Sequence, residues 1–253
     1  MTDPHHVAEE YDRIGSDYQE SKQLPFRLHI EEYTAFGLLP DLAGRSVVDL
    51  ACGEGIYARK LMRRGAARVL GVDISVEMIA LATRAEEATA TGVEYLQADV
   101  TTLDLAEQFD VAFCAFLFNY AGNQAELRAL IDSVARLVKP GGLVVGSNDY
   151  PDNPPARYDS YRPYGFVKIG QDEPDEGSTI TYRFFNLDGA VFELDNYYLP
   201  TEAYRREFAE AGLIDFDWVM PEVSPEGRDA FAPGFWDDYL EAPPMVSFLA
   251  HAP

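Results

Sequence analysis

Val47-Val-Asp-Leu-Ala-Cys-Gly-Glu-Gly55 is the stretch that decides the fold expected for this chain. A short β-branched run leads directly into two glycines, and a helical pattern begins at Ile56. Gly53 and Gly55 allow the backbone to turn tightly between a strand and a helix and to approach a ligand closely. In open α/β sheets, ligands bind at the carboxyl ends of the strands, where this loop lies. The stretch therefore predicts a strand, a ligand-binding loop and a helix.

Strands and helices alternate around this loop. Strands are expected over residues 45–50, 67–73, 93–97, 109–116 and 143–147. Helices are expected over residues 56–64, 75–87 and 124–138, with Ser75 as the N-cap of the second. This βαβα order predicts a Rossmann-like α/β fold, a mostly parallel sheet with helices on both faces. The pattern leaves the order of the strands in space open.

The character of the chain changes after Asp149. Residues 150–162 are rich in Pro, Tyr and Asp and are expected to form a loop. Three strand-like runs follow at 165–169, 178–185 and 190–198, and Asp188-Gly189 between the last two indicates a hairpin turn. We expect residues 150–200 to form a small antiparallel insertion in a single domain spanning 1–253. The insertion could cap a pocket or pair with a second subunit.

The last part of the chain predicts one more helix and two more strands. Thr201 is expected to cap a helix that ends near Gly212. Strands over 214–220 and 245–251 could form an antiparallel edge of the main sheet.

The charge balance limits the partners of this chain. Its 20 basic and 43 acidic residues give a formal charge of −23, so nucleic acid is not an expected partner. Salt adaptation and steering of a cationic ligand both fit this acidity. Two cysteines without a disulfide pattern fit a reducing cytosol, and no stretch has the length of a membrane span. We expect a cytoplasmic protein outside the membrane, with its oligomeric state open.

The glycine loop alone fits two kinds of ligand. Gly53-Glu-Gly-Ile-Tyr-Ala58 matches the dinucleotide pattern G-x-G-x-x-A, which would suit a nicotinamide-dependent oxidoreductase. However, Asp49 and Glu54 would disfavour a diphosphate at this loop and suit a ligand with a cationic end. Asp73 ends the next strand, where a carboxylate can accept two hydrogen bonds from a ribose diol.

Four ordered motifs resemble those of class I S-adenosylmethionine-dependent methyltransferases. They are Val48-Asp-Leu-Ala-Cys-Gly-Glu-Gly55, Gly71-Val-Asp-Ile-Ser75 with Met78, Gln97-Ala-Asp99, and Leu137-Val-Lys-Pro-Gly-Gly142. The resemblance covers about residues 40 to 150. It implies the small-molecule type of this methyltransferase fold, with S-adenosylmethionine as cofactor and S-adenosylhomocysteine as product.

The resemblance also implies residue roles. Asp49 would lie near the methionine ammonium, Asp73 would hold the ribose hydroxyls, and Asp99 would bond the adenine amino group. Further cofactor contacts are implied for Ala51, Gly53, Gly55, Ile74, Met78, Val100 and Phe116. Core packing is the alternative for the Ile and Met of this set, and a turn or helix cap is the alternative for Asp99.

The N-terminal segment is similar to that of toxoflavin-type N-methyltransferases. Tyr11-Asp-Arg-Ile-Gly-Ser-Asp-Tyr18 precedes Arg27, and residues 1–40 are expected to form a helical lead over the cofactor. Arg27 is the candidate for the methionine carboxylate because a guanidinium fork binds both oxygens. Tyr18 is a second cofactor contact, and Tyr11 could point towards the methyl group or the substrate. Surface exposure of Arg27 and packing of the tyrosines are the alternatives.

Substrate contacts are expected after the fourth and fifth strands. Asn119, Tyr120 and Asn148 could orient a polar heteroatom, and together with Tyr11 they are the catalytic candidates. Trp236 and Tyr239 could close the pocket over a flat ring.

The residue inventory bears on which atom accepts the methyl group. Methyl transfer is an in-line displacement, so the protein mainly holds nucleophile and methyl in line. A nitrogen needs only a free lone pair, whereas a hydroxyl usually needs a base, for which His29 is the sole histidine candidate. No residue cluster has metal-ligand spacing. We expect an N-methyltransferase acting on a small amine or heteroaromatic of secondary metabolism. An O-methyltransferase, a nicotinamide oxidoreductase and a cofactor-binding protein without catalysis are the alternatives.

Overall fold

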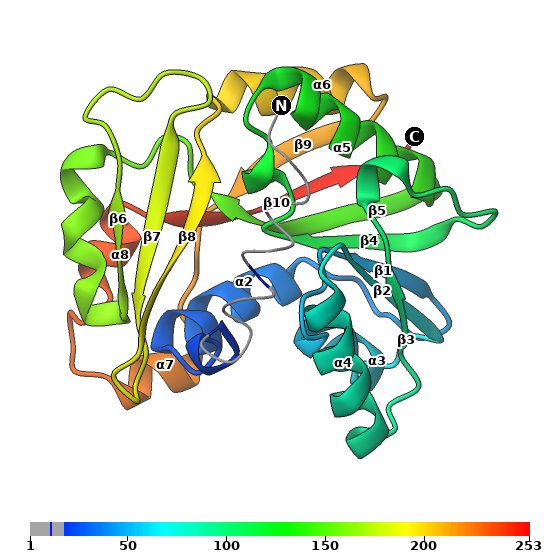
Figure 1. The fold of residues 1–253 in the computed structure, drawn as a ribbon, viewed down its shortest axis with the longest axis horizontal. Helices are drawn as coiled ribbons and strands as arrows, with labels where there is room; N and C mark the ends of the chain where they lie inside the picture. The colour runs from blue at the N-terminus through cyan, green and yellow to red at the C-terminus, as the bar shows by residue number, and fades with distance from the viewer. Residues whose placement is uncertain (1–10, 12–17) are drawn as a thin grey trace.

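The main sheet has seven strands in the order β3-β2-β1-β4-β5-β10-β9 (Figure 1). The structure is a computed structural model and describes Tyr11 and residues 18–253. The strands are β1 (Ser46–Leu50), β2 (Arg68–Asp73), β3 (Glu94–Gln97), β4 (Phe109–Ala115), β5 (Val138–Asp149), β9 (Ile214–Val219) and β10 (Met245–His251). The first five are parallel, and β10 runs antiparallel between β5 and β9. The strand order therefore reverses between β1 and β4, where open α/β sheets bind ligands.

Helices cover both faces of this sheet, as predicted (Figure 1). The helices are α2 (Glu32–Gly37), α3 (Ile56–Arg63), α4 (Val76–Thr89), α5 (Gln124–Leu137), α6 (Thr201–Glu210), α7 (Pro225–Ala230) and α8 (Asp237–Glu241). One hydrophobic cluster joins the sheet to α5 and α6 through residues such as Ile131 and Phe208. A second joins the other face to α2 and α3 through residues such as Phe36 and Leu61. Among the described residues, no helix has the length and apolar character needed to cross a membrane.

The insertion forms a separate three-stranded antiparallel sheet. Its strands are β6 (Phe166–Ile169), β7 (Thr179–Phe185) and β8 (Val191–Tyr197), in that order. Side chains alternate along β7, so that Ile180, Tyr182 and Phe184 are buried. These side chains belong to a third hydrophobic cluster, which also contains Phe26 of the N-terminal segment and Tyr239. The predicted antiparallel insertion is confirmed.

The segment before this sheet differs from the prediction. Pro155–Tyr164 is a 3₁₀ helix (η4) rather than a loop. Its buried residues are Tyr158, Tyr161 and Tyr164, spaced three apart. A 3₁₀ helix has three residues per turn, so this spacing puts all three rings on one face towards the core. Tyr158 and Tyr161, expected in the loop, therefore form the apolar stripe of a helix together with Tyr164.

Two boundary predictions also need correction. The fifth strand starts at Val138 rather than Leu143 and includes the Lys-Pro-Gly-Gly run. Pro200, not Thr201, is the N-cap residue of α6, and the Thr201 hydroxyl donates to Asp152 at 3.0 Å instead of capping the helix. In contrast, Ser75 caps α4 as predicted, because its Oγ accepts a hydrogen bond from the Met78 backbone N–H at 3.0 Å.

Candidate active site at the carboxyl ends of the parallel strands

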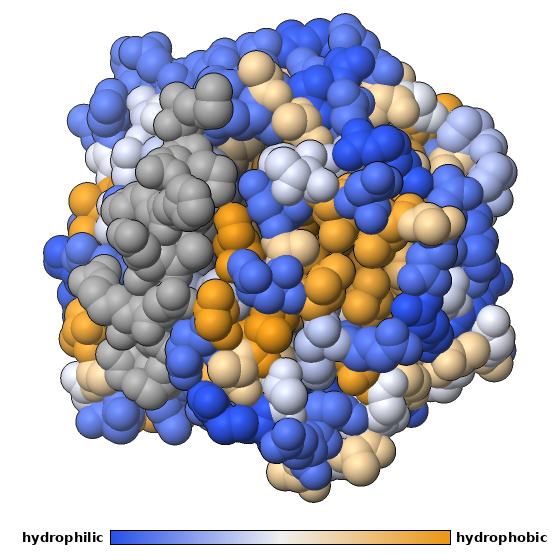
Figure 2. Space-filling view, turned by 45° about the vertical axis from the view of Figure 1, so that its right-hand side comes forward, coloured by the Kyte–Doolittle hydropathy of each residue, from blue (hydrophilic) through white to orange (hydrophobic). Residues whose placement is uncertain are grey.

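A cavity of about 490 Å³ opens at the carboxyl ends of β1, β2, β3 and β4. Figure 2 shows apolar residues gathered on one face of the molecule and bordered by polar ones. Most of the cavity lining is apolar, and α5 contributes Ala125, Ala129 and Leu130. The site residues predicted from the sequence that line it are Tyr11, Tyr18, Ala51, Gly53, Asp73, Ile74, Asp99, Val100, Phe116 and Tyr120. Its volume is typical of sites for ligands of nucleoside size or larger.

The loop after β1 is held by the end of β2. Asp73 Oδ2 accepts a hydrogen bond from the Gly53 backbone N–H at 2.7 Å, and Asp73 Oδ1 accepts one from the Ser75 N–H at 2.9 Å. Ala51, Gly53 and Phe116 line the cavity with left-handed backbone conformations, φ 57°, 54° and 65°. Such conformations are strained for Ala and Phe and gather at functional sites. The loop is thus a fixed cradle for a ligand.

Asp49 is a buried carboxylate with an unusual environment. It is 1% exposed, and neither oxygen has a hydrogen-bond partner among the described residues. Burial, followed by the nearby Asp73 carboxylate, raises the pKa of Asp49 to about 8. Burial also raises the pKa of Glu54, whose Oε2 accepts a hydrogen bond from Gln19 at 2.5 Å. Lys22 and the Ala58 backbone N–H act to lower the pKa of Asp49, and a cationic group of a ligand would add to their effect.

The opposite end of the cavity begins after β3. Asp99 Oδ1 accepts a hydrogen bond from the Thr101 backbone N–H at 2.8 Å, so the carboxylate caps the short 3₁₀ helix η2 (Val100–Thr102). Asp99, Val100 and Ile74 also line the cavity. Asp99 therefore caps a helix, which is the alternative to a ligand contact, and its carboxylate nevertheless lies at the cavity wall.

Six predicted site residues lie outside the cavity lining: Arg27, Asp49, Gly55, Met78, Asn119 and Asn148. Met78 is fully buried beneath the loop, with its Sδ 4.0 Å from the place of a Cβ on Gly53. Gly55 packs against Tyr95, because a Cβ at Gly55 would lie 2.6 Å from the Tyr95 ring. Asn148 faces α6, where its Nδ2 donates to the Tyr204 hydroxyl at 3.2 Å. Since side chains alternate along β5, Asp149 faces the insertion instead, and Asn148 lines neither the cavity nor the space beside the inserted sheet.

A smaller chamber adjoins the cavity and shares four aromatic residues with it. Its volume is about 30 Å³, and the shared residues are Tyr11, Tyr18, Phe116 and Tyr120. We call it the aromatic chamber. Its remaining walls are Arg27, Asn119, Tyr182, Phe184, Leu194, Asn196 and Met245. The inserted sheet therefore forms one wall of the chamber.

Tyr11 and Tyr182 of the chamber remain protonated near neutral pH. The Tyr11 and Tyr120 hydroxyls contact each other. Burial, and then the neighbouring Tyr120, raises the pKa of Tyr11 well above its usual value. Tyr182 donates its hydroxyl to the buried Asp149, and burial followed by this carboxylate raises its pKa as well. Neither the Tyr11 hydroxyl nor the Tyr182 hydroxyl is a ready base.

Arg27 is buried rather than on the surface. It lies on a π-helical turn (η1, Arg27–Glu31), and its Nη1 donates to Glu31 Oε2 at 2.9 Å. Its guanidinium also lies near the rings of Tyr18 and Phe116, 5.7 Å and 5.9 Å from their centroids. Burial alone would lower the pKa of Arg27, but Glu31 raises it, so the side chain stays charged. The exposed alternative for Arg27 is wrong.

The residues expected to close the pocket or act as a base lie elsewhere. Trp236 donates its Nε1–H to the Gly227 carbonyl at 3.0 Å, and Tyr239 is buried in the cluster around the inserted sheet. His29 Nδ1 lies 3.2 Å from the Ser224 hydroxyl. These three residues line neither the cavity nor the chamber, so their proposed roles there are wrong.

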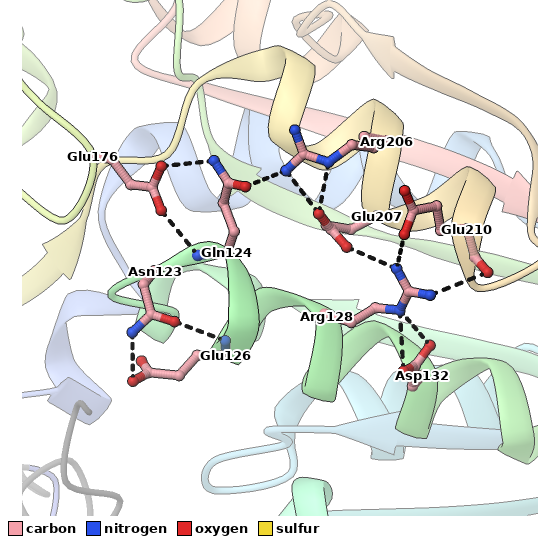
Figure 3. Close-up of polar contacts among 9 residues, drawn as sticks. All are labelled: Asn123, Gln124, Glu126, Arg128, Asp132, Glu176, Arg206, Glu207 and Glu210. Carbon is pink, nitrogen blue, oxygen red and sulfur yellow. Dashed lines mark hydrogen bonds and ion pairs between the residues drawn. The ribbon is translucent and has the colours of Figure 1, made fainter.

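The start of α5 is a part of the site that sequence reasoning missed. Asn123 caps this helix, and its Nδ2 donates a hydrogen bond to Glu126 Oε1 at 2.8 Å; both residues line the cavity. Glu176 of the insertion accepts from the Gln124 backbone N–H at 3.1 Å, as Figure 3 shows. The pattern Asn-x-x-Glu before an apolar run is a capping signature that could have revealed this wall.

On the outer side of α5, Arg128 anchors the helix to α6. Its Nη1 donates to Glu207 at 2.9 Å and to Glu210 at 2.5 Å (Figure 3). In the part of the chain that the structure describes, no group of three or more His, Cys, Asp or Glu side chains is placed to hold a metal ion.

The fold and the site together define a class. A glycine loop after the first strand, an acidic residue ending the second, and a cavity at the reversal of strand order form the class I methyltransferase fold. Residues 47–142 match the family described as a methyltransferase domain. This part of the chain is thus similar to methyltransferase domains, in agreement with the resemblance stated from the sequence motifs.

Known proteins with similar sequences are also named methyltransferases. The ubiquinone biosynthesis O-methyltransferase of Acinetobacter baumannii (strain ACICU) is 34% identical over 133 residues, which are 51% of this chain and 53% of that protein. The same-named protein of Pseudomonas fluorescens (strain SBW25) is 34% identical over 41% of this chain and 44% of that protein. The chain thus spans about half the length of the curated relatives it matches.

Solved structures share the fold over almost the whole chain. An S-adenosylmethionine-dependent methyltransferase from Mesorhizobium loti superposes with a TM-score of 0.62 at 20% identity, covering 91% of this chain and 99% of that one. CalS10, an amino pentose methyltransferase from Micromonospora echinaspora solved with S-adenosylmethionine bound, has a TM-score of 0.58 at 19% identity, covering 95% and 97%. At these identities, the likeness establishes the fold.

Proposed function

We propose that this protein transfers a methyl group from S-adenosylmethionine to a nitrogen of a small amine or heteroaromatic molecule. The cofactor, when bound, supplies an electrophilic methyl on a sulfonium. The Asp49 carboxylate, which lacks a hydrogen-bond partner among the described residues, is the observation that carries the cofactor assignment, because the cofactor has a cationic methionine end. Asp73 would hold the ribose, and Asp99, Ile74 and Val100 would bind the adenine.

The proposed acceptor site is the junction of the main cavity and the aromatic chamber, because the chamber alone, at about 30 Å³, has room for only part of an acceptor. The faces of the chamber are rings that a planar molecule can stack on, and its carboxamides, Asn119 and Asn196, can donate to or accept from a heteroatom. Asn119 is already oriented, since its Oδ1 accepts a hydrogen bond from the Asp149 backbone N–H at 3.0 Å. We propose that the insertion over residues 150–200 acts as the cap of this site in a single domain.

The choice of nitrogen rests on the bases that the chamber offers. Among its described walls there is no histidine and no carboxylate, and the pKa of Tyr11 and that of Tyr182 are raised by burial. A nitrogen lone pair attacks without a base, whereas a hydroxyl usually must lose its proton first. The chamber therefore suits nitrogen better than oxygen.

A small-molecule O-methyltransferase is the second candidate. The relatives matched over half of the chain are named O-methyltransferases, and this observation alone favours it. An acidic phenol, ionised before it binds, would need no protein base, and Arg27 at the chamber wall would suit its negative charge.

The decisive experiment measures S-adenosylhomocysteine formation with panels of amines, heteroaromatics and phenols. We expect turnover with a nitrogen acceptor, and we expect Tyr11→Phe to lower kcat without shifting the pH profile. Turnover with phenols only, or a profile that moves with Tyr11→Phe, would favour the O-methyltransferase. Binding of NADH but not of S-adenosylhomocysteine would instead restore the oxidoreductase alternative, and cofactor binding without turnover would leave a binding protein.

A further inference from the structure

A third cavity lies between α3 and the N-terminal segment that precedes α2. Its volume is about 190 Å³. Five cationic side chains line it together with a single carboxylate, that of Glu32; the cations are Lys22, Arg27, Arg59, Lys60 and Arg63. The whole chain has only 20 basic residues against 43 acidic ones, so this cavity concentrates charge of the minority sign. We call it the basic cavity.

The sequence of α3 builds one wall of the basic cavity. Ile56, Arg59, Lys60 and Arg63 follow the spacing i, i+3, i+4 and i+7, which places them on one face of the helix. Leu61 lies on the other side, in the hydrophobic cluster against the sheet. The cationic face is therefore a consequence of the helical period and not of a flexible loop.

These cations are only partly neutralised, although Arg27 is paired with Glu31 and Glu54 interacts with Lys22 and Arg59. Arg27 Nε is buried without a hydrogen-bond partner among the described residues. The Lys22 ammonium lies over the rings of Tyr18 and Tyr57, 4.6 Å and 5.3 Å from their centroids. Arg59 donates its Nη1 to neutral acceptors, the Glu54 carbonyl at 2.8 Å and the Tyr95 hydroxyl at 3.2 Å. Because a buried cation that is only partly neutralised is costly, the cavity favours an anion.

The remaining cations differ in their partners. Lys60 forms an ion pair with Glu32, whereas Arg63 is exposed and forms no ion pair with another described residue. Glu32 of the lining, together with Glu31 and Glu54 beside it, stands against five positive charges, which leaves a local excess of positive charge in an otherwise acidic molecule.

We propose that the basic cavity binds a phosphate group. Guanidinium forks and ammonium groups match the oxygens of phosphate in charge and geometry. The volume is below the usual range for a nucleotide-sized ligand, so the group is a free phosphate or the terminal phosphate of a small metabolite. Long polyanions would be repelled by the net charge of −23. This proposal does not depend on the methyl-transfer proposal.

Arg27 connects this cavity to the aromatic chamber. Its side chain lines both spaces, and Glu31 holds both the Arg27 guanidinium and the Tyr57 hydroxyl. Phosphate in the basic cavity would therefore change the field at the proposed acceptor site. Such a link is reciprocal, so a ligand in the chamber would change the phosphate affinity by the same factor.

Inorganic phosphate and glycerol 3-phosphate are the probes that test the site. Each is titrated into the full-length protein by calorimetry at constant ionic strength, with chloride replacing phosphate in the blank. We expect saturable binding at one site. Arg63→Gln should weaken this binding by about tenfold or more, because it removes roughly one charge-assisted contact. Arg64→Gln is the matched control, because Arg64 lies next in the chain, stacks over Phe36 at 5.2 Å and does not line the cavity.

The outcomes separate the proposal from its alternatives. Tighter binding of glycerol 3-phosphate identifies a metabolite phosphate as the source, and equal binding identifies free phosphate. No saturable binding, or equal weakening by both arginine substitutions, would overturn the site. Full displacement of phosphate by S-adenosylhomocysteine would also overturn it, because the anion would then occupy the methionine carboxylate position. Circular dichroism of each variant confirms that it is folded.

Discussion

Asp73 accepts a hydrogen bond from the Gly53 backbone N–H at 2.7 Å, so the residue that ends β2 fixes the loop that follows β1. The same carboxylate lines the main cavity. One side chain therefore shapes the cradle and faces the ligand, and its removal should affect both.

Asp73→Asn should weaken binding of S-adenosylhomocysteine by tenfold or more. The amide keeps one acceptor oxygen but loses the charge, and hydrogen bonds to charged groups contribute about 1.5–3 kcal/mol. Calorimetry measures the change. Asp217→Asn is the control, since Asp217 is an exposed carboxylate of β9, 3.8 Å from Arg205. Equal affinity in wild type and Asp73→Asn would contradict the ribose assignment.

The raised pKa of Asp49 makes a prediction for stability against pH. The folded protein keeps Asp49 protonated up to about pH 8, whereas the unfolded chain ionises near pH 3.8. The folded state binds the extra proton in this window, so its stability falls as pH rises from about 4 to 8 and then levels. Asp49→Asn removes this loss. The free energy of unfolding of Asp49→Asn relative to wild type should therefore rise with pH over this range, measured by denaturant titration; a constant difference would refute the prediction.

Ligand binding should release a proton from Asp49. The ammonium of S-adenosylhomocysteine beside Asp49 would favour the ionised carboxylate and lower its pKa from about 8. At pH 7, binding should then release up to about one proton in wild type and correspondingly less in Asp49→Asn. Calorimetry in buffers of different ionisation enthalpy counts these protons. Release of the same number of protons by both proteins would show that the ammonium of the ligand does not lie beside Asp49.

Gly55 should tolerate no side chain. Its φ is 74°, and an added Cβ would lie 2.6 Å from the Tyr95 ring. Gly55→Ala should lower the free energy of unfolding by about 2–4 kcal/mol, from backbone strain and overpacking together. Gly189→Ala is matched in backbone, with φ 92° and open space around the Cβ, and should cost about 1 kcal/mol. A similar loss of unfolding free energy in the two variants would show that the Tyr95 side chain moves to make room for the added methyl group.

The sequence predicted those features that depend on neighbours along the chain. The alternation of strands and helices, the Ser75 cap and the antiparallel insertion follow from local periodicity and turn residues, and the structure has them. The surroundings of Asn148 are set by the face of β5 on which it lies, and those of Gly55 are set by the nearby Tyr95 ring. Such contacts between distant segments carry no local signal, so the sequence did not predict that Asn148 contacts Tyr204 or that Gly55 packs against Tyr95.

The tyrosines of η4 show a second source of error. Their spacing of three was visible, but the surrounding prolines and aspartates suggested a loop. The basic cavity was missed for a related reason, since Lys22 and Arg63 come together only when the N-terminal segment packs against α3.

The position of β10 between β5 and β9 has a consequence for synthesis. Among the described strands, β9 pairs with β10 alone, although β10 lies more than twenty residues later in the sequence. As the ribosome extends the chain, Ile214–Val219 therefore has no place in the sheet until His251 has emerged, and the side edge of β5 stays open meanwhile. An open strand edge can pair with another chain, so this interval is when the nascent protein most needs protection from aggregation.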